Sequence, residues 1–348
     1  MRSPRAVPSV PAVPSVPFAP SASAVLAGAV LALALVAGSA APAVADGHDG
    51  FTITDPRIVE SSGLAASRAH PGVYWTHNDQ DKGAYLYAVD SRTGKTVATV
   101  TMSGIGAPRD VEAISVGADG NLYVGDIGDN LGGTWSNVWI YKLPEPKTLK
   151  DQTVRATQYV VKYEDGARDA EALMVHPKTG RIYIADKKEE GGSLYEGPAQ
   201  MSASGTNVFK KIAATDLWVT DGAFSPDGEQ LALRGYFGGA SFAWKGAGKQ
   251  PEREGRLSVP FQRQGESVTY TPDGTTLMYG TEGAQSQVTP VEVRGKGGGG
   301  GSGAPSGGGG SDSSAKSGGL DGGLKTGAIV AGAVLLAFFG LKRLLRRC

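Results

Sequence analysis

The chain has almost no cysteine and very little histidine. Its single cysteine, Cys348, is the last of 348 residues, so no disulfide can form within the rest of the chain. A cysteine nucleophile and a thiolate metal site are excluded there for the same reason. A Gly-x-Ser-x-Gly nucleophile motif is also missing, since residues 265–268 (GESV) lack the closing glycine. Of the four histidines, His77 is the one in a plausible site.

The chain also has no net charge, but its basic residues are unevenly distributed. Nine of the 34 Lys and Arg residues and two of the 34 Asp and Glu residues lie outside positions 46–294. The central region therefore carries 25 basic and 32 acidic residues, a net charge of about −7. This excess of acid argues against a nucleic-acid partner for the region.

The N-terminal segment has the pattern of an export signal. Residues 1–45 contain two early arginines, an apolar run at 24–36 and the small residues Ala-Val-Ala at the end. We expect cleavage after Ala45 and export of the chain. The absence of cysteine from the exported part and the Ala- and Gly-rich ends favour a bacterial source.

The C-terminal segment has the pattern of a tethered membrane anchor. Residues 295–323 are nearly all Gly, Ser and small polar residues and predict a flexible linker with a root-mean-square span of roughly 30 Å. Residues 324–341 are apolar apart from one lysine and predict a transmembrane helix, with an interfacial helix as the alternative. The basic tail at 342–348 places that end in the cytoplasm.

Between these ends, one sequence pattern recurs. Residues 109–130 (RDVEAISVGADGNLYVGDIGDN) predict two strands joined by a turn, and similar segments occur at 168–187, 220–235 and 264–283, with a weaker copy at 62–81. When the copies are aligned on Gly63, Glu112, Glu171, Gly222 and Glu266, they lie 49, 59, 51 and 44 residues apart. A period of 40–50 residues with four strands in each is typical of a β-propeller.

We therefore predict an all-β domain over residues 46–294, a β-propeller of five four-stranded blades, with six as the alternative. The fifth blade lacks a fourth strand, which Phe51–Thr54 or Arg57–Glu60 can supply from the N-terminal end. Closure of this kind removes the exposed sheet edges. In the second blade, Val154–Tyr163 is expected to be one continuous fourth strand.

Acidic residues gather at the starts of the predicted first strands. The first strands line the channel of a propeller, so these residues should converge on one axis, and they are Asp110, Glu112, Asp169, Glu171, Asp221 and Glu266. Oxygen ligands without His or Cys favour Ca²⁺. The alternatives are that each carboxylate latches one blade to the next, paired with Arg109 or Arg168, or that the carboxylates act directly in catalysis.

Polar loops after the second strands form a further candidate site. Asp126, Asp129 and Asn130 have the composition of a tight cation-binding loop, although the loop lacks the glutamate of an EF-hand. The equivalent loop in the first blade contains His77, Asn78 and Asp79, which we expect at a ligand-binding rim. Trp135, in a glycine-containing loop, is a candidate stacking platform for a sugar or peptide.

The motifs DVEAISVGADGNLYVGDIGDN, DAEALMVHPKTGRIYIAD, FSPDGEQLAL and GESVTYTPDGTTLMYG resemble those of secreted bacterial β-propellers of the WD40-like, TolB-like and YVTN-like groups. The resemblance covers about 245 residues and implies a binding platform, although propellers also include hydrolases. We expect a membrane-anchored cell-surface module, with a structural Ca²⁺, for an extracellular protein, peptide or glycan. The alternative is a calcium-dependent extracellular hydrolase of phosphoesters or glycans.

Overall fold

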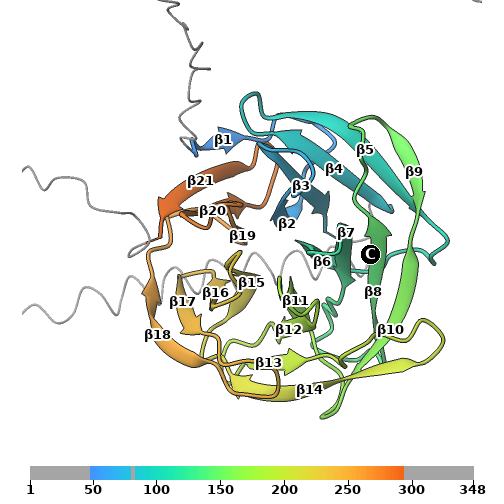
Figure 1. Ribbon diagram of the computed structural model, residues 1–348, viewed down its shortest axis with the longest axis vertical. Helices are drawn as coiled ribbons and strands as arrows, with labels where there is room; N and C mark the ends of the chain where they lie inside the picture. Colours follow the sequence, from blue (N-terminus) through green and yellow to red (C-terminus); the bar gives the residue numbers. More distant parts are fainter. Residues whose placement is uncertain (1–47, 80–82, 294–348) are drawn as a thin grey trace, which may run out of the picture. The chain divides into compact units, whose positions relative to one another are not determined.

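The computed structural model describes residues 48–79 and 83–293, and every regular element in this part of the chain is a β-strand. The strands are arranged around a central axis, as in a β-propeller (Figure 1). Within these residues, no helix has the length and apolar character needed to cross a bilayer. The predicted signal peptide, linker, apolar helix and basic tail lie outside the described residues.

The strands form antiparallel groups, numbered here as repeats 1 to 5 in chain order. Repeat 1 contains β2 (Ser61–Ala66), β3 (Val73–Asn78), β4 (Tyr85–Asp90) and β5 (Lys95–Ser103). Repeat 2 contains β6 (Val111–Val116), β7 (Asn121–Asp126), β8 (Val138–Pro144) and β10 (Thr157–Tyr163). Repeat 3 contains β11 (Ala170–Val175), β12 (Ile182–Asp186), β13 (Ser193–Glu196) and β14 (Thr206–Ala214).

Repeat 4 contains β15 (Val219–Phe224), β16 (Gln230–Gly235), β17 (Gly238–Ala243) and β18 (Glu252–Leu257). Repeat 5 contains β19 (Gly265–Tyr270), β20 (Thr276–Thr281) and β21 (Gln287–Glu292), and its fourth strand is β1 (Phe51–Thr52) from the other end of the domain. The pairing of Phe51 with Val288 confirms the predicted contribution of an N-terminal strand. This pairing covers the edge of β21 that would otherwise be free to pair with another chain.

The first strands of the repeats surround the axis. Each contacts the next in chain order, β2 with β6, β6 with β11, β11 with β15 and β15 with β19, and β19 contacts β2. Residues near the starts of these strands therefore approach one another although they are distant in sequence. This ring of strands positions the candidate site.

The prediction of one strand over Val154–Tyr163 is wrong. The segment divides at Ala156 into the end of β9 (Gln152–Arg155) and β10, because Ala156 is buried in the core and its N–H donates to the carbonyl of Ser103. β9 pairs in parallel with β5 of repeat 1, whereas β10 pairs in parallel with β14 of repeat 3. The segment predicted as one strand is thus two strands, β9 paired with repeat 1 and β10 paired with repeat 3.

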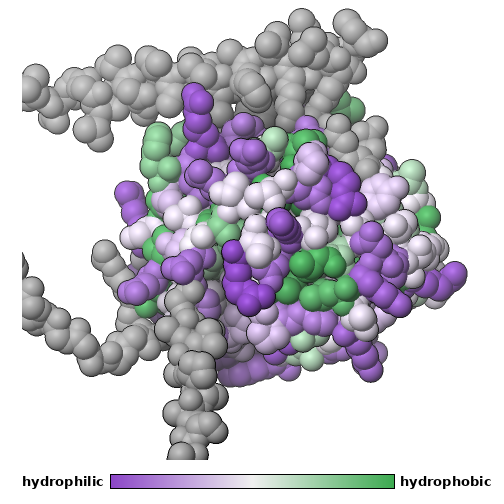
Figure 2. Space-filling model, turned by 90° about the horizontal axis from the view of Figure 1, so that it is seen from above, coloured by the Kyte–Doolittle hydropathy of each residue, from purple (hydrophilic) through white to green (hydrophobic). Residues whose placement is uncertain are grey.

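The apolar core lies between adjacent repeats. Separate clusters of buried side chains fill the spaces between repeats 1 and 2, 2 and 3, 3 and 4, and 5 and 1. Between repeats 4 and 5, Arg234 is 1% exposed and donates hydrogen bonds to the carbonyls of Ser267 and Gly280. The face seen in Figure 2 is mostly hydrophilic with separate apolar patches.

Candidate functional site

A β-bulge near the start of every first strand shapes the axial site. The strand register shifts at Glu112, Glu171, Thr220 and Glu266, and at Ser62 together with Gly63. A bulge leaves a residue out of the ladder and changes the direction of its side chain. The sequence alignment on Gly222 was therefore wrong, because Thr220 occupies the bulge of repeat 4. In repeat 1 the bulge contains Ser62 as well as the aligned Gly63.

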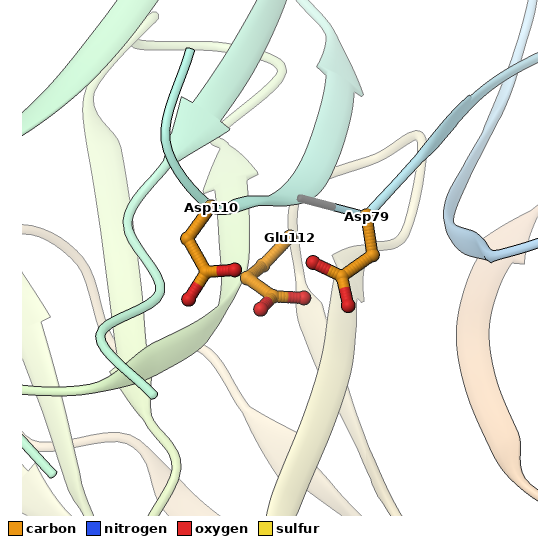
Figure 3. Close-up of side chains that lie close together, drawn as sticks. All are labelled: Asp79, Asp110 and Glu112. Atoms are coloured by element: carbon orange, nitrogen blue, oxygen red, sulfur yellow. The ribbon is translucent and has the colours of Figure 1, made fainter. Parts of the chain in front are cut away.

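The carboxylates of Asp79, Asp110 and Glu112 lie together at this end of the ring and point toward one another (Figure 3). Each offers an oxygen within 4.8 Å of the others, and Asp110 and Glu112 are buried. Asp79 follows β3 in repeat 1, whereas the other two belong to repeat 2. The axial convergence predicted for Asp110 and Glu112 is present, and Asp79, predicted at the rim, joins them.

Three neighbours position this acidic cluster. The Nδ2 group of Asn130 donates a 2.6 Å hydrogen bond to Oδ2 of Asp110, and the hydroxyl of Ser62 donates to Oε2 of Glu112 at 3.1 Å. Gly128 lies against both carboxylates, since a Cβ built on it would be 2.7 Å from Asp110 Oδ2 and from Glu112 Oε1. Only a residue without a side chain leaves room for the two carboxylates in this position.

Burial makes ionisation of the axial carboxyls unfavourable. Burial, reinforced by the charge of Asp79, raises the pKa of Asp110 to about 9 and that of Glu112 well above its ordinary value. Burial also raises the pKa of Glu266 to about 8 and that of Asp169 to about 6. The site therefore contains more carboxyl groups than it can hold ionised without additional positive charge.

Lys187 supplies part of that charge, and the sequence analysis had not assigned it this role. It follows β12, and its ammonium group forms an ion pair with Glu171. Its charge also lowers the pKa of Glu266 against the dominant effect of burial. A lysine directly after a second strand, at the position that Ile127 has after β7, was the available sequence signal.

The expected pairing of Arg109 and Arg168 with the axial carboxylates is wrong. The guanidinium group of Arg109 lies between two indole rings, 4.0 Å from the centre of Trp135 and 3.7 Å from that of Trp139. Arg168 forms an ion pair with Asp165 and donates to the hydroxyl of Tyr195. Both side chains therefore support the loops. The ring of Trp135 is half-buried and is covered on one side by Arg109.

The remaining acidic loop residues accept backbone hydrogen bonds. Asp126 accepts from the N–H groups of Arg109 and Asp110 and from the hydroxyl of Tyr141. Asp129 accepts from the N–H groups of Leu131 and Trp135, and its own N–H donates to Asp169. These carboxylates hold the loop that carries Gly128 and Asn130.

Asp221 links two repeats. Its carboxylate, which is 1% exposed, accepts from the N–H group of Val268 in repeat 5 and from that of Gly222. This contact is of the latch type that the sequence analysis considered for all the axial acids. The group containing Asp110 and Glu112 has a different arrangement, with three carboxylates facing one another.

The expectation of an exposed rim at His77 and Asn78 is wrong. His77 is 1% exposed and packs against Gly63, and burial lowers its pKa to about 4. The side chain of Asn78 accepts from the N–H groups of Val59 and Glu60 and donates to the carbonyl of Arg57. Both residues are on a strand with a buried pattern, and the side-chain amide of Asn78 fixes the entry to β2.

No protein-family model matches the sequence, and no curated protein matches it. Among solved structures, the chain is similar to U3-55K, with 12% identity, a TM-score of 0.37, and coverage of 66% of this chain and 68% of that one. A gluconolactonase from Xanthomonas campestris has 16% identity, a TM-score of 0.43, and coverage of 70% and 78%. A chain of the mitotic checkpoint complex has 14% identity, a TM-score of 0.38, and coverage of 66% and 60%.

Proposed function

We propose that the protein is a β-propeller interaction module in which a divalent cation, Ca²⁺, is held at one end of the axis. The five repeats correspond to five blades, and the cation binds to Asp79, Asp110 and Glu112. Its role is to join loops from repeats 1 and 2 and so to fix the face of the propeller that receives a partner.

The observation that carries this proposal is the convergence of three carboxylates, two of them buried, on one point. Like charges in a buried site repel, and a bound cation removes the repulsion and allows the carboxyls to ionise. The hydrogen bonds from Asn130 and Ser62 fix the direction of two carboxylates but supply no charge. The ammonium group of Lys187 forms its ion pair with Glu171, which belongs to β11 of repeat 3.

The donor chemistry supports Ca²⁺. The side chains around the cluster offer carboxylate, amide and hydroxyl oxygens, which are the ligands that Ca²⁺ prefers. Zn²⁺ is a poorer match because structural zinc sites usually include His or Cys ligands. The close approach of Gly128 to two carboxylates supports a site shaped for a small ion.

We also propose that the propeller is displayed on the outer surface of a cell membrane. This part of the proposal rests on the signal-like segment at 1–45, the Gly- and Ser-rich segment at 295–323 and the apolar and basic segments that follow. Cell fractionation, with protease added to intact cells, tests it directly. Protection of the propeller from the protease would contradict surface display.

The cation is tested by thermal melting of the full chain in EDTA and in millimolar CaCl₂. We expect Ca²⁺ to raise the melting temperature by several degrees, because a ligand that binds only the folded state stabilises it by mass action. The double variant Asp110→Asn with Glu112→Gln should lose this response. In EDTA the same variant should melt no lower than the native chain, because it removes buried carboxyls that repel each other.

The matched control for this experiment is Asp165→Asn, which changes an acidic side chain paired with Arg168 outside the cluster. It should keep the full response to Ca²⁺. An equal melting temperature of the native chain in EDTA and in CaCl₂ would contradict the proposed cation. So would an undiminished response in the double variant.

A further inference from the structure

The exposed apolar side chains are concentrated at the acidic end of the axis. Seven large apolar side chains are more than a third exposed in the described part of the chain, and five of them share this end. We call these five the apolar rim: Val59, Tyr85, Leu131, Phe237 and Phe261. The other two, Val97 and Val208, lie on the fourth strands β5 and β14.

The strand register places the rim at this end. In each antiparallel repeat, the start of the first strand faces the end of the second, as in the pairs Val111 with Asp126 and Val219 with Gly235. Phe237 lies two residues after Gly235, in the β16–β17 turn, and Phe261 precedes the start of β19. Both therefore lie at the end where Glu112, Glu171 and Glu266 begin their strands. They are 69% and 103% exposed, respectively.

An aromatic wall connects the rim to the axial acids. The ring of Tyr236 packs edge-on against Trp218 at 5.0 Å and lies 6.5 Å from the ring of Phe237. The charges of Glu266 and Glu171 act on the hydroxyl of Tyr236, and the ammonium of Lys187 lies 5.8 Å from the centre of its ring. The wall thus extends from the buried carboxyl groups of Glu171 and Glu266 to the exposed ring of Phe237.

We infer that this face binds a basic, apolar-flanked segment of a protein partner. A lysine or arginine of the partner enters beside Tyr236 and Glu266, and apolar residues next to it pack on Phe237 and Phe261. The inference rests on the proposed function as an interaction module and names the kind of partner. The inferred contact uses side chains of repeats 4 and 5, whereas the proposed Ca²⁺ site uses side chains of repeats 1 and 2.

Two observations favour a cationic side chain as the inserted group. First, Lys187 already places an alkylammonium group next to Glu171 and the ring of Tyr236. Aromatic faces attract such cations, more strongly where water is excluded. Second, residues 46–294 carry a net charge of about −7, so a basic partner is attracted at a distance as well as in contact.

The rim matches the apolar part of the partner. Exposed aromatic side chains are enriched at interaction surfaces. Large apolar side chains gathered at one end of the axis, beside buried acidic residues, are uncommon on a surface that stays in water. Phe237 lies in the β16–β17 turn of repeat 4, and Phe261 lies in the segment between repeats 4 and 5. A glutamate or aspartate in the same position would add negative charge beside carboxyl groups whose ionisation is already opposed by burial.

The inference is tested with two acetylated tripeptide amides, Leu-Lys-Phe and Leu-norleucine-Phe, titrated calorimetrically into the full chain in CaCl₂. The two differ by the ammonium group alone. We expect the lysine peptide to bind at least tenfold more tightly. The double variant Phe237→Ala with Phe261→Ala should weaken its binding at least tenfold, and the matched control Val97→Ala with Val208→Ala should change it less than twofold.

Equal binding of the two peptides, no binding of either, or equal behaviour of the rim and control variants would overturn the inference. Melting with and without Ca²⁺ on the same variants separates it from the proposed function. Lysine selectivity in a native chain that does not respond to Ca²⁺ would support the basic partner and contradict the cation. A normal Ca²⁺ response without lysine selectivity would support the cation and contradict the basic partner.

Discussion

The indole nitrogen of Trp75 in β3 donates a 2.8 Å hydrogen bond to Oε1 of Glu145, which follows β8 in the next repeat. The same oxygen accepts from the hydroxyl of Ser67 at 2.6 Å. Trp75 is fully buried and Glu145 is 6% exposed, so water cannot replace this carboxylate. The contact joins repeats 1 and 2 at the end of the ring opposite the acidic cluster.

Glu145→Ala should lower the free energy of unfolding by about 2–6 kcal/mol, since each buried donor left without an acceptor costs about 1–3 kcal/mol. Urea denaturation followed by tryptophan fluorescence measures this change. Glu252→Ala is the control, because Glu252 forms an exposed ion pair with Lys245, and it should leave the stability nearly unchanged. Equal stability of the two variants would contradict the linking role of Glu145.

The stability of the cation-free protein should fall as the pH rises from 7 to 9. The folded state holds protons on Asp110 and Glu266 up to a pKa of about 9 and about 8, whereas the unfolded chain releases them near pH 4. Stability from a raised pKa is present at low pH and is lost as the pH rises through the folded value. Melting in EDTA at pH 7, 8 and 9 should therefore show a steady decline.

Because the pKa of His77 is lowered to about 4, this residue reduces stability only as the pH falls below about 6.5. It therefore does not change stability between pH 7 and 9. Ca²⁺ should remove most of the decline, because the bound ion stabilises the ionised carboxylates. Asp110→Asn should reduce the fall of the melting temperature in EDTA between pH 7 and 9. A melting temperature in EDTA that stays constant or rises from pH 7 to 9 would contradict the raised pKa values.

Gly128→Ala should abolish or strongly weaken the response to Ca²⁺. The added methyl group would lie 2.7 Å from oxygens of both Asp110 and Glu112 and would force them apart. Gly255→Ala is the matched control, because a Cβ at Gly255 meets no atom within 4 Å. The melting shift caused by CaCl₂ measures both, and a full shift in the Gly128 variant would show that the cation binds elsewhere.

Arg234→Met should destabilise the protein by about 3–5 kcal/mol, the usual cost of removing one partner from a buried charged network. The change leaves the carbonyls of Ser267 and Gly280 without their donor and removes the positive charge near Glu266. Arg234→Lys should recover only part of this loss, because lysine lacks the planar fork of the guanidinium group. Urea denaturation measures the stabilities of the native chain and of the two variants. An Arg234→Met variant as stable as the native chain would contradict the stabilising role of Arg234.

Much of the architecture could be predicted from the sequence, because its main signals are local. Alternating apolar residues and turns such as Ala118–Asn121 fix where strands begin and end, and their recurrence indicates repeats. The pairing of Phe51 with β21 followed from a missing fourth strand. The division of Val154–Tyr163 did not follow, because it depends on the burial of Ala156 against a repeat distant in sequence.

The candidate site was less predictable, since it depends on bulges and side-chain directions. Asp110 and Glu112 were expected at the axis, but Thr220 was missed because a bulge adds a residue without changing the strand pattern. Arg109 was expected to pair with acids, and its stacking between two tryptophans is a tertiary contact. An acidic neighbour in the sequence does not show whether an arginine pairs with that acid or stacks on aromatic rings.

The most direct test of the account is calorimetric titration of CaCl₂ into the full chain after removal of metal by EDTA and dialysis. We expect saturable binding of one Ca²⁺ per chain in the site formed by Asp79, Asp110 and Glu112. We also expect the double variant Asp110→Asn with Glu112→Gln to lose that binding. Absence of saturable binding to the native chain, or unchanged binding to the double variant, would contradict the central claim.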